Sequence, residues 1–133
     1  MLMKPITRRI IVLGAIILSG IGSRLVSSGF VLFDNYLGDA LYAAMLFMLL
    51  LVLAPRLTLA KAALISFGVV VLIELFQLTN IPLAMRSHEN SLLRLIAIVL
   101  GTTFNGWDLV SYAIGILIFF GYEAYWARVE VAQ

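Results

Sequence analysis

Four charged side chains in otherwise apolar stretches are the residues of this chain best suited to chemistry. They are the cation Arg24 and the carboxylates Asp39, Glu74 and Asp108. Charged groups in or at the edge of a hydrocarbon layer are costly, so they are retained mainly where they pair or act. Carboxylates can bind a cation, carry a proton or serve as general acid and base. The four residues therefore predict a polar site inside an apolar protein.

The composition indicates which elements must hold these charges. The chain has 133 residues, of which 63% are hydrophobic and 12% are charged. Soluble domains carry about 25% charged residues, so this chain is very poorly suited to building a soluble surface. We expect an integral membrane protein, and the length predicts one transmembrane helical domain over residues 1–133. The chain lacks cysteine, which excludes a structural disulfide.

Four apolar stretches are long enough for membrane-spanning helices, because a hydrocarbon core about 30 Å thick needs roughly 20 helical residues. Ser28-Gly29 and Asp34-Asn35 predict a loop after the first stretch, and Pro55 ends the second. Residues 91–100 are apolar but too short to cross, which predicts an interfacial or re-entrant helix before the last span. The expected fold is an all-α polytopic membrane protein with four transmembrane helices, at about residues 9–28, 38–54, 61–80 and 107–126.

The four charges fall at one depth in this arrangement. At about 1.5 Å per helical residue, each lies roughly 20–27 Å above the inner end of its span. All four therefore belong to the outer leaflet, although they come from different spans. Neighbouring polar residues share the same helix faces at spacings of three or four. The predicted site comprises Arg24, Asp39, Tyr42, Glu74, Gln77, Asp108 and Tyr112.

The expected packing is a four-helix bundle with a polar pocket open toward the outer surface. Ala15, Ser19 and Ser23 form a stripe of small residues that allows close helix contact. Arg24 follows this stripe directly, and we expect it to compensate at least one carboxylate, Glu74 first.

Simpler roles for these charges stay open. Asp39 and Asp108 fall at predicted helix N-termini, where a carboxylate caps the helix and favours its dipole. Arg24 near a helix end can extend to the lipid headgroups. Glu74 lies inside a span, where a buried and paired structural role is the alternative to a functional one. His88 stands alone in a polar loop, which is typical of a solvated residue rather than a ligand.

Several segments resemble a known family. Residues 22–24 (Gly-Ser-Arg), 38–42 (Gly-Asp-Ala-Leu-Tyr), 73–77 (Ile-Glu-Leu-Phe-Gln) and 101–115 are similar to the small bacterial DUF2809 membrane proteins, and the resemblance covers nearly the whole chain. The Glu-x-x-Gln and Asp-x-x-x-Tyr-x-x-Gly patterns resemble the VanZ-like group more loosely, since that group usually has Asn where this chain has Tyr112. The resemblance implies a four-span inner-membrane protein of uncharacterised activity.

Three classes of function fit the predicted site. An outer-leaflet pocket suits binding or handling of a lipid-linked or amphiphilic molecule, and its excess of acids favours a cationic or hydroxylated group, or a proton. A membrane-embedded enzyme using carboxylates is the alternative, including a divalent cation held by Asp39, Glu74 and Asp108. However, the chain has no HExxH, nucleophile elbow, cysteine or histidine cluster. In a structural or assembly subunit the charges would only lock helices together.

The expected partners follow from the same composition. Membrane lipids and a lipid-linked small molecule are predicted, with homo-oligomer formation left open. A net charge of +2 is too small and scattered for a nucleic-acid surface. No cofactor and no resident metal are expected.

The distribution of lysine and arginine predicts the orientation. With the N-terminus inside, the cytoplasmic side receives Lys4, Arg8, Arg9, Arg56, Lys61 and Arg128, and the outer side receives Arg24, Arg86 and Arg94. This distribution predicts a multi-pass protein with both termini in the cytoplasm, and the resemblance implies that its membrane is the bacterial inner membrane. Reporter fusions at both termini should give cytoplasmic signals, and a periplasmic signal from the C-terminus would contradict the even number of spans.

Overall fold

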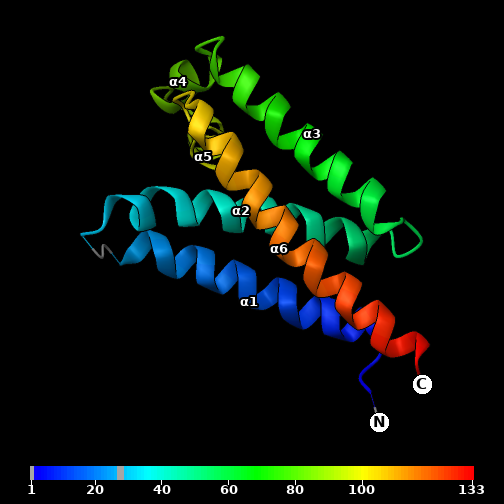
Figure 1. Ribbon diagram of the computed structural model, residues 1–133. Coiled ribbons are helices and arrows are strands. Elements are labelled where there is room, and N and C mark those ends of the chain that lie inside the picture. The colour runs from blue at the N-terminus through cyan, green and yellow to red at the C-terminus, as the bar shows by residue number, and fades with distance from the viewer. Residues whose placement is uncertain (1, 27–28) are drawn as a thin grey trace.

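Helices make up the regular structure of this protein. The computed structural model describes residues 2–26 and 29–133, with the backbone alone described for residues 31–34 (Figure 1). Within those ranges six α-helices follow one another: α1 (Pro5–Leu25), α2 (Val31–Leu53), α3 (Leu59–Gln77), α4 (Ile81–Arg86), α5 (Ser91–Leu100) and α6 (Gly106–Val131).

Four of these helices are long and apolar enough to cross a membrane. The candidate spans within the described chain are Pro5–Leu25, Asn35–Leu53, Leu59–Gln77 and Gly106–Val131. The short apolar helix α5 precedes the last span, as predicted, and its ten residues extend only about 15 Å. The all-α class with four candidate spans and one short helix is confirmed.

Side chains at the helix ends explain where the elements begin and stop. Thr58 caps α3 by accepting a hydrogen bond from the Lys61 N–H at 3.2 Å. Asn105 caps α6 in the same way, accepting from the Trp107 N–H at 3.2 Å. Such caps satisfy backbone donors that have no partner within the helix. Helix α2 ends at Leu53, just before Pro55, because proline cannot continue a helix.

The second helix starts earlier than the sequence suggested. It begins at Val31, so Asp34 and Asn35 are helical and the predicted loop at this pair is wrong. Neither residue blocks helical geometry as proline does, and both only lower helix propensity. Asp39 therefore lies well inside α2, so N-terminal capping does not explain it. Ser28, the predicted end of the first span, lies outside the described residues.

Two further boundaries differ from the predictions. The last helix continues to Val131 rather than ending at Trp126, because its final turns pair with α1 through charged side chains. The short helix α4 was not predicted in the polar stretch after residue 80. It follows Asn80, whose left-handed φ of 60° ends the preceding turn, and Pro82 lies in its first turn.

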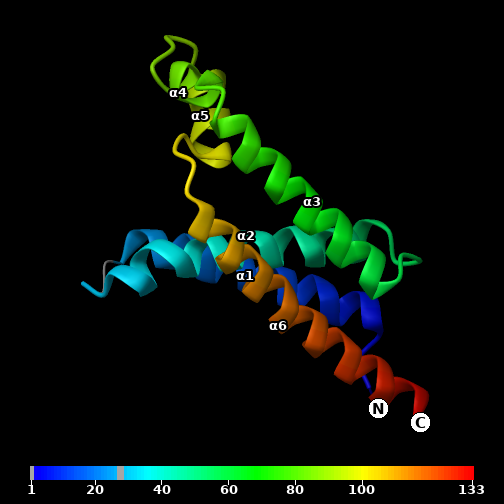
Figure 2. The same ribbon diagram turned by 45° about the horizontal axis from the view of Figure 1, so that its top comes forward.

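Helix α2 is the centre of the packing. It packs against α1, α3 and α6, and its inward face carries the fully buried side chains of Phe47, Met48 and Leu51. Phe47 and Met48 are thus core residues. Figures 1 and 2 show α6 passing across α2 while the two termini lie at the same end of the molecule. Both termini lie at the same end because the chain has an even number of candidate spans.

The crossing of α2 and α6 depends on a glycine. A Cβ atom built on Gly115 would lie 2.0 Å from the backbone oxygen of Ala40, far inside van der Waals contact. Membrane helices lack a hydrophobic driving force toward one another, so close approach at small residues supplies much of their packing energy. The predicted stripe on α1 does less than expected, because Ala15 and Ser19 are exposed and only Ser23 approaches α2.

Substituting Gly115 by alanine should therefore separate α2 from α6. We expect a loss of about 1–3 kcal/mol or more, the usual cost of overpacking, measured by thermal unfolding in detergent. Gly121→Ala is the matched control on the same helix, since a Cβ there meets nothing within 4 Å. The control should be neutral or slightly stabilising, because alanine in a helix is more favourable than glycine by about 1 kcal/mol. Equal effects of the two substitutions would contradict the close crossing.

Candidate functional site

One cavity collects every residue of the predicted site. It has a volume of about 220 Å³ and lies at the end of the molecule remote from the termini. Its side-chain lining comes from α1, α2, α3, α5 and α6 and the segment before α6. It contains Arg24, Asp39, Tyr42, Glu74, Gln77, Ile98, Val99, Thr102, Thr103, Asp108 and Tyr112. The structure thus brings all seven predicted residues together, while their role in binding a ligand stays a prediction.

Glu74 is the most deeply buried acid of this cavity, with 1% of its surface exposed. The hydroxyl of Tyr112, on α6, donates a hydrogen bond to Glu74 Oε1 on α3 at 2.8 Å. This bond joins two helices, which gives Glu74 a structural function. The second oxygen, Oε2, is buried and has no hydrogen-bond donor among the described residues. Glu74 therefore retains an unused acceptor beside the cavity.

Gln77 lies one turn further along α3 and has the same incomplete pairing. Its Nε2 donates to the backbone oxygen of Leu100 at 2.7 Å, which ties the end of α5 to α3. Its Oε1 is buried, and the described part of the chain offers it no donor. Gly101 makes this approach feasible, because it has a φ of +80° and a Cβ there would lie 2.8 Å from Gln77 Nε2.

Asp39 and Asp108 are the other two acids of this cavity. Asp39 is half-buried on α2, and Asp108 lies in the first turn of α6. Carboxylates that share one site repel each other, so a proton, a cation or a donor group between them is favourable. In the first turn of α6, the negative charge of Asp108 also interacts favourably with the helix dipole, while Asn105 caps the helix.

Arg24 differs from the prediction. It is exposed in the last turn of α1, where a cation favours the helix dipole. Its Nε lies 4.0 Å from the position that a Cβ of Gly38 would occupy. Within the described ranges no ion pair involves Arg24, and Glu74 accepts from Tyr112 instead, so the expected Arg24–Glu74 pair is wrong. One oxygen of the buried acid accepts from a neutral donor, and Arg24 acts on Asp39 through its charge.

The alternative of a metal site has no matching geometry. Among the residues that the structure describes, no group of three or more histidine, cysteine, aspartate and glutamate side chains is arranged to hold a metal ion. Asp39, Glu74 and Asp108 share one cavity without forming such a group.

An apolar cavity adjoins the acidic one. It has a volume of about 310 Å³ and lies between α1, α2 and α5. Gly20 on α1 lines it together with large aliphatic side chains such as Ile17 and Ile21. The two cavities have four lining residues in common: Arg24, Tyr42, Ile98 and Val99. A charged space and an apolar space therefore meet at one boundary.

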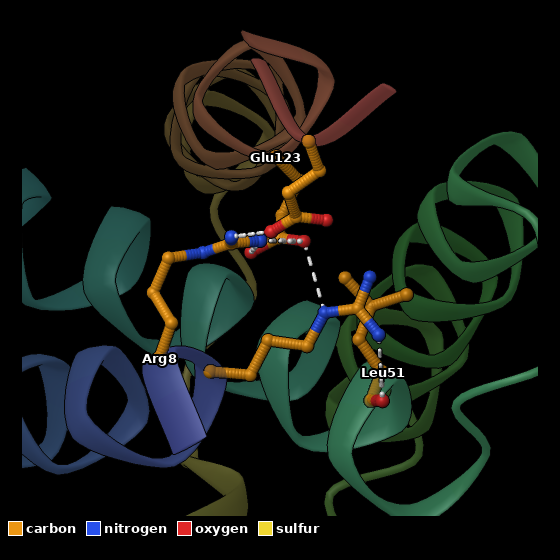
Figure 3. A network of polar contacts seen from close by, with 5 residues as sticks. Arg8, Leu51 and Glu123 are labelled. Atoms are coloured by element: carbon orange, nitrogen blue, oxygen red, sulfur yellow. Dashed lines mark hydrogen bonds and ion pairs between the residues drawn. The ribbon is translucent and has the colours of Figure 1, made fainter. Parts of the chain in front are cut away.

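A second charged cluster, at the end near the termini, was missed in the sequence. Figure 3 shows Arg8 of α1 and Glu123 of α6 pointing toward each other, with Leu51 of α2 close by. Arg8 NH2 lies 3.3 Å from Glu123 Oε2, and Arg9 Nε lies 2.9 Å from the same oxygen. Arg9 NH1 also donates to the Leu51 oxygen at 3.4 Å, and Arg8 pairs with Glu130 as well.

The sequence contained one signal for this cluster. Glu123 lies within the predicted span 107–126, and an acid there needs a partner as much as Glu74 does. Arg8 and Arg9 also fit a cytoplasmic surface by their position along the chain, so their pairing with α6 was not predicted. Glu123 is 1% exposed, so the network is a buried clasp between α1, α2 and α6.

A double-mutant cycle should detect the bond between α3 and α6. Glu74→Ala and Tyr112→Phe should couple by about 0.6–1.7 kcal/mol, the range of polar contacts between membrane helices, in thermal unfolding in detergent. Arg24→Ala combined with Glu74→Ala should be nearly additive, because Arg24 makes no ion pair to Glu74. Strong coupling of Arg24 to Glu74 and none of Tyr112 would contradict this geometry.

The clasp should depend much more on one acid than on the other. Glu123→Gln removes the carboxylate that lies between buried Arg8 and half-buried Arg9, and removing one partner of a buried ion pair typically costs about 3–5 kcal/mol. Glu130→Gln should cost less, because the Glu130 side chain is 28% exposed and Arg8 retains Glu123. Unfolding midpoints of the two variants in one detergent test this order, and its reversal would refute the clasp.

Comparison with known proteins gives one match. Residues 29–116 match the family model described as "Protein of unknown function (DUF2809)". Neither a curated protein nor a solved structure matches the chain. The matched range contains six of the seven predicted site residues, whereas Arg24 and the resembling segment 22–24 lie outside it. The looser VanZ-like resemblance is not tested by this match.

Proposed function

We propose that this chain, which belongs to the DUF2809 family, binds one amphiphilic molecule of the outer leaflet of the bacterial inner membrane. The observation that carries the proposal is the junction of the two cavities. The acidic cavity and the apolar cavity share Arg24 and Tyr42 at their boundary. A ligand with a polar head and a hydrocarbon tail fits such a pair, whereas a small soluble ligand would use only one half.

The chemistry of the head follows from the unused acceptors. Glu74 Oε2 and Gln77 Oε1 are buried beside the cavity without donors from the described residues. A buried acceptor without a partner costs about 1–3 kcal/mol, so a ligand that donates hydrogen bonds there is stabilised. The Asp39–Asp108 pair adds further acceptors, and Arg24 is an exposed cation at the boundary. The proposed head is therefore an ammonium group or a set of hydroxyls.

The tail is proposed to lie in the apolar cavity. Together the two cavities reach the size of ordinary small-molecule sites, about 300–1,000 Å³. Gly20 leaves room in its wall, because a Cβ there meets nothing within 4 Å. Ile98 and Val99 of α5 line both cavities, so the short helix would cover the junction of head and tail.

The interior beyond the site supports binding rather than passage through the protein. The buried side chains of Phe47, Met48 and Ile116 lie between the acidic cavity and the clasp at the other end. These apolar side chains offer no polar groups for an ion or a charged head. In the proposed orientation the termini and the clasp are cytoplasmic, and the site opens toward the periplasmic side.

Lipid analysis of the full-length protein, purified in mild detergent from its native membrane, tests this function. We expect one amphiphile with a donor-rich head to be enriched about tenfold over the surrounding lipids, equivalent to about 1.4 kcal/mol. Gly20→Phe should fill the apolar cavity and abolish the enrichment. Gly121→Phe, which replaces an exposed glycine of α6 with equally open surroundings, should retain it.

A second variant tests the head. Glu74→Gln removes the charge but preserves an oxygen that accepts from Tyr112, so folding should survive while enrichment falls. The proposal fails if no molecule is enriched, or if Gly20→Phe and Gly121→Phe give the same lipid profile. If the protein is a structural subunit that binds no such molecule, Gly20→Phe and Gly121→Phe should give the same lipid profile. Their unfolding midpoints should then equal that of the unchanged protein.

A further inference from the structure

We infer a second binding site, for a zwitterionic phospholipid with a primary ammonium, between the start of α1 and the end of α6. A cavity of about 320 Å³ lies there, at the end of the molecule where Figure 1 places both termini. It is lined by Leu2, Met3, Arg8, Ile11, Val12, Tyr122, Trp126 and Glu130. It shares no lining residue with either cavity of the proposed amphiphile site.

Arg8 supplies the donor of this site. Only 8% of its surface is exposed, and its two terminal nitrogens are taken up by Glu123 and Glu130. Its Nε is buried and finds no acceptor among the described residues. The guanidinium centre lies 5.3 Å from the ring centroid of Trp126, which holds it in place. A phosphate oxygen is the acceptor that arginine binds most readily in this setting.

Glu130 supplies the acceptor for the other half of the headgroup. It lines the same cavity and binds Arg8 through Oε1 alone, while a carboxylate can accept about four hydrogen bonds. A primary ammonium can donate to its remaining positions. A headgroup that carries both phosphate and ammonium therefore complements Arg8 and Glu130 together. A purely anionic headgroup would bring its phosphate close to the Glu130 carboxylate, and a trimethylammonium group has no N–H to donate.

The surroundings suit a lipid that stands along the helices. Ile11 and Val12 give the cavity an apolar wall on α1, and Ile11 is 55% exposed. Tyr122 and Trp126 form its other wall on α6, with ring centroids 6.4 Å apart. Aromatic residues of this kind lie at the level of the headgroups, where one edge is apolar and the other polar.

Native mass spectrometry of the delipidated full-length protein tests the site with three phospholipids of identical chains. The headgroups are phosphoethanolamine, phosphocholine and phosphoglycerol. We expect the ethanolamine lipid to bind about tenfold more tightly than the other two, equivalent to about 1.4 kcal/mol. Glu130→Gln should remove its advantage over the choline lipid, because the amide no longer attracts the ammonium. Equal binding of the three lipids, or an unchanged preference in Glu130→Gln, would overturn the inference.

Two adjacent isoleucines provide the matched steric test. Ile10 and Ile11 are 53% and 55% exposed on the same helix, but only Ile11 lines the cavity. Ile11→Trp should reduce binding of the ethanolamine lipid about tenfold, and Ile10→Trp should leave it unchanged. Gly20→Phe should also leave it unchanged, which separates this site from the proposed amphiphile site. Equal effects of the two tryptophan substitutions would refute the site.

Discussion

The close contact of α2 with α6 at Ala40 and Gly115 is the constraint on which the rest of the structure depends. Asp39 immediately precedes the contact residue of α2, and Tyr112 lies one turn before the contact residue of α6. The contact therefore brings polar groups of both helices to one level. From that position the Tyr112 hydroxyl reaches Glu74 on α3, and this bond adds the third helix to the site. A bulkier residue at the crossing would move all of these groups apart.

The two charged clusters of the protein differ in how well they are satisfied. At the end near the termini, Arg8 and Arg9 face Glu123 and Glu130, so the formal charges balance. At the other end the acids outnumber the cation, and buried acceptors lack donors from the described chain. A balanced buried cluster can hold helices in register, although the Arg8 Nε of this cluster has no acceptor among the described residues. An unbalanced one is poised for a partner that brings donors or positive charge.

Much of this architecture could be predicted from the sequence because membrane helices obey a length requirement. Apolar stretches set the four candidate spans, and a constant rise per residue placed Arg24, Asp39, Glu74 and Asp108 at one end of them. All four line the same cavity in the structure. The rule works for such residues because depth depends only on position along a helix, not on how the helices pack.

Pairing could not be predicted by the same rule, because it depends on helix rotation and crossing. Depth alone made Arg24 the natural partner of Glu74, whereas the contact at Gly115 turns Tyr112 toward it. The clasp at Glu123 escaped notice because its arginines fit the cytoplasmic surface equally well. The early start of α2 at Val31 was missed because Asp34 and Asn35 lower helix propensity without blocking helical geometry.

A density map of the full-length protein in lipid nanodiscs made from its native membrane would show whether one amphiphile occupies both cavities. We expect one continuous feature that crosses the boundary at Arg24 and Tyr42. Its polar end should lie beside Glu74 and Gln77, and its chain should pass Gly20. Two empty cavities, or a feature confined to the apolar cavity while Glu74 and Gln77 are satisfied by protein groups, would rule out binding of one amphiphile across both cavities.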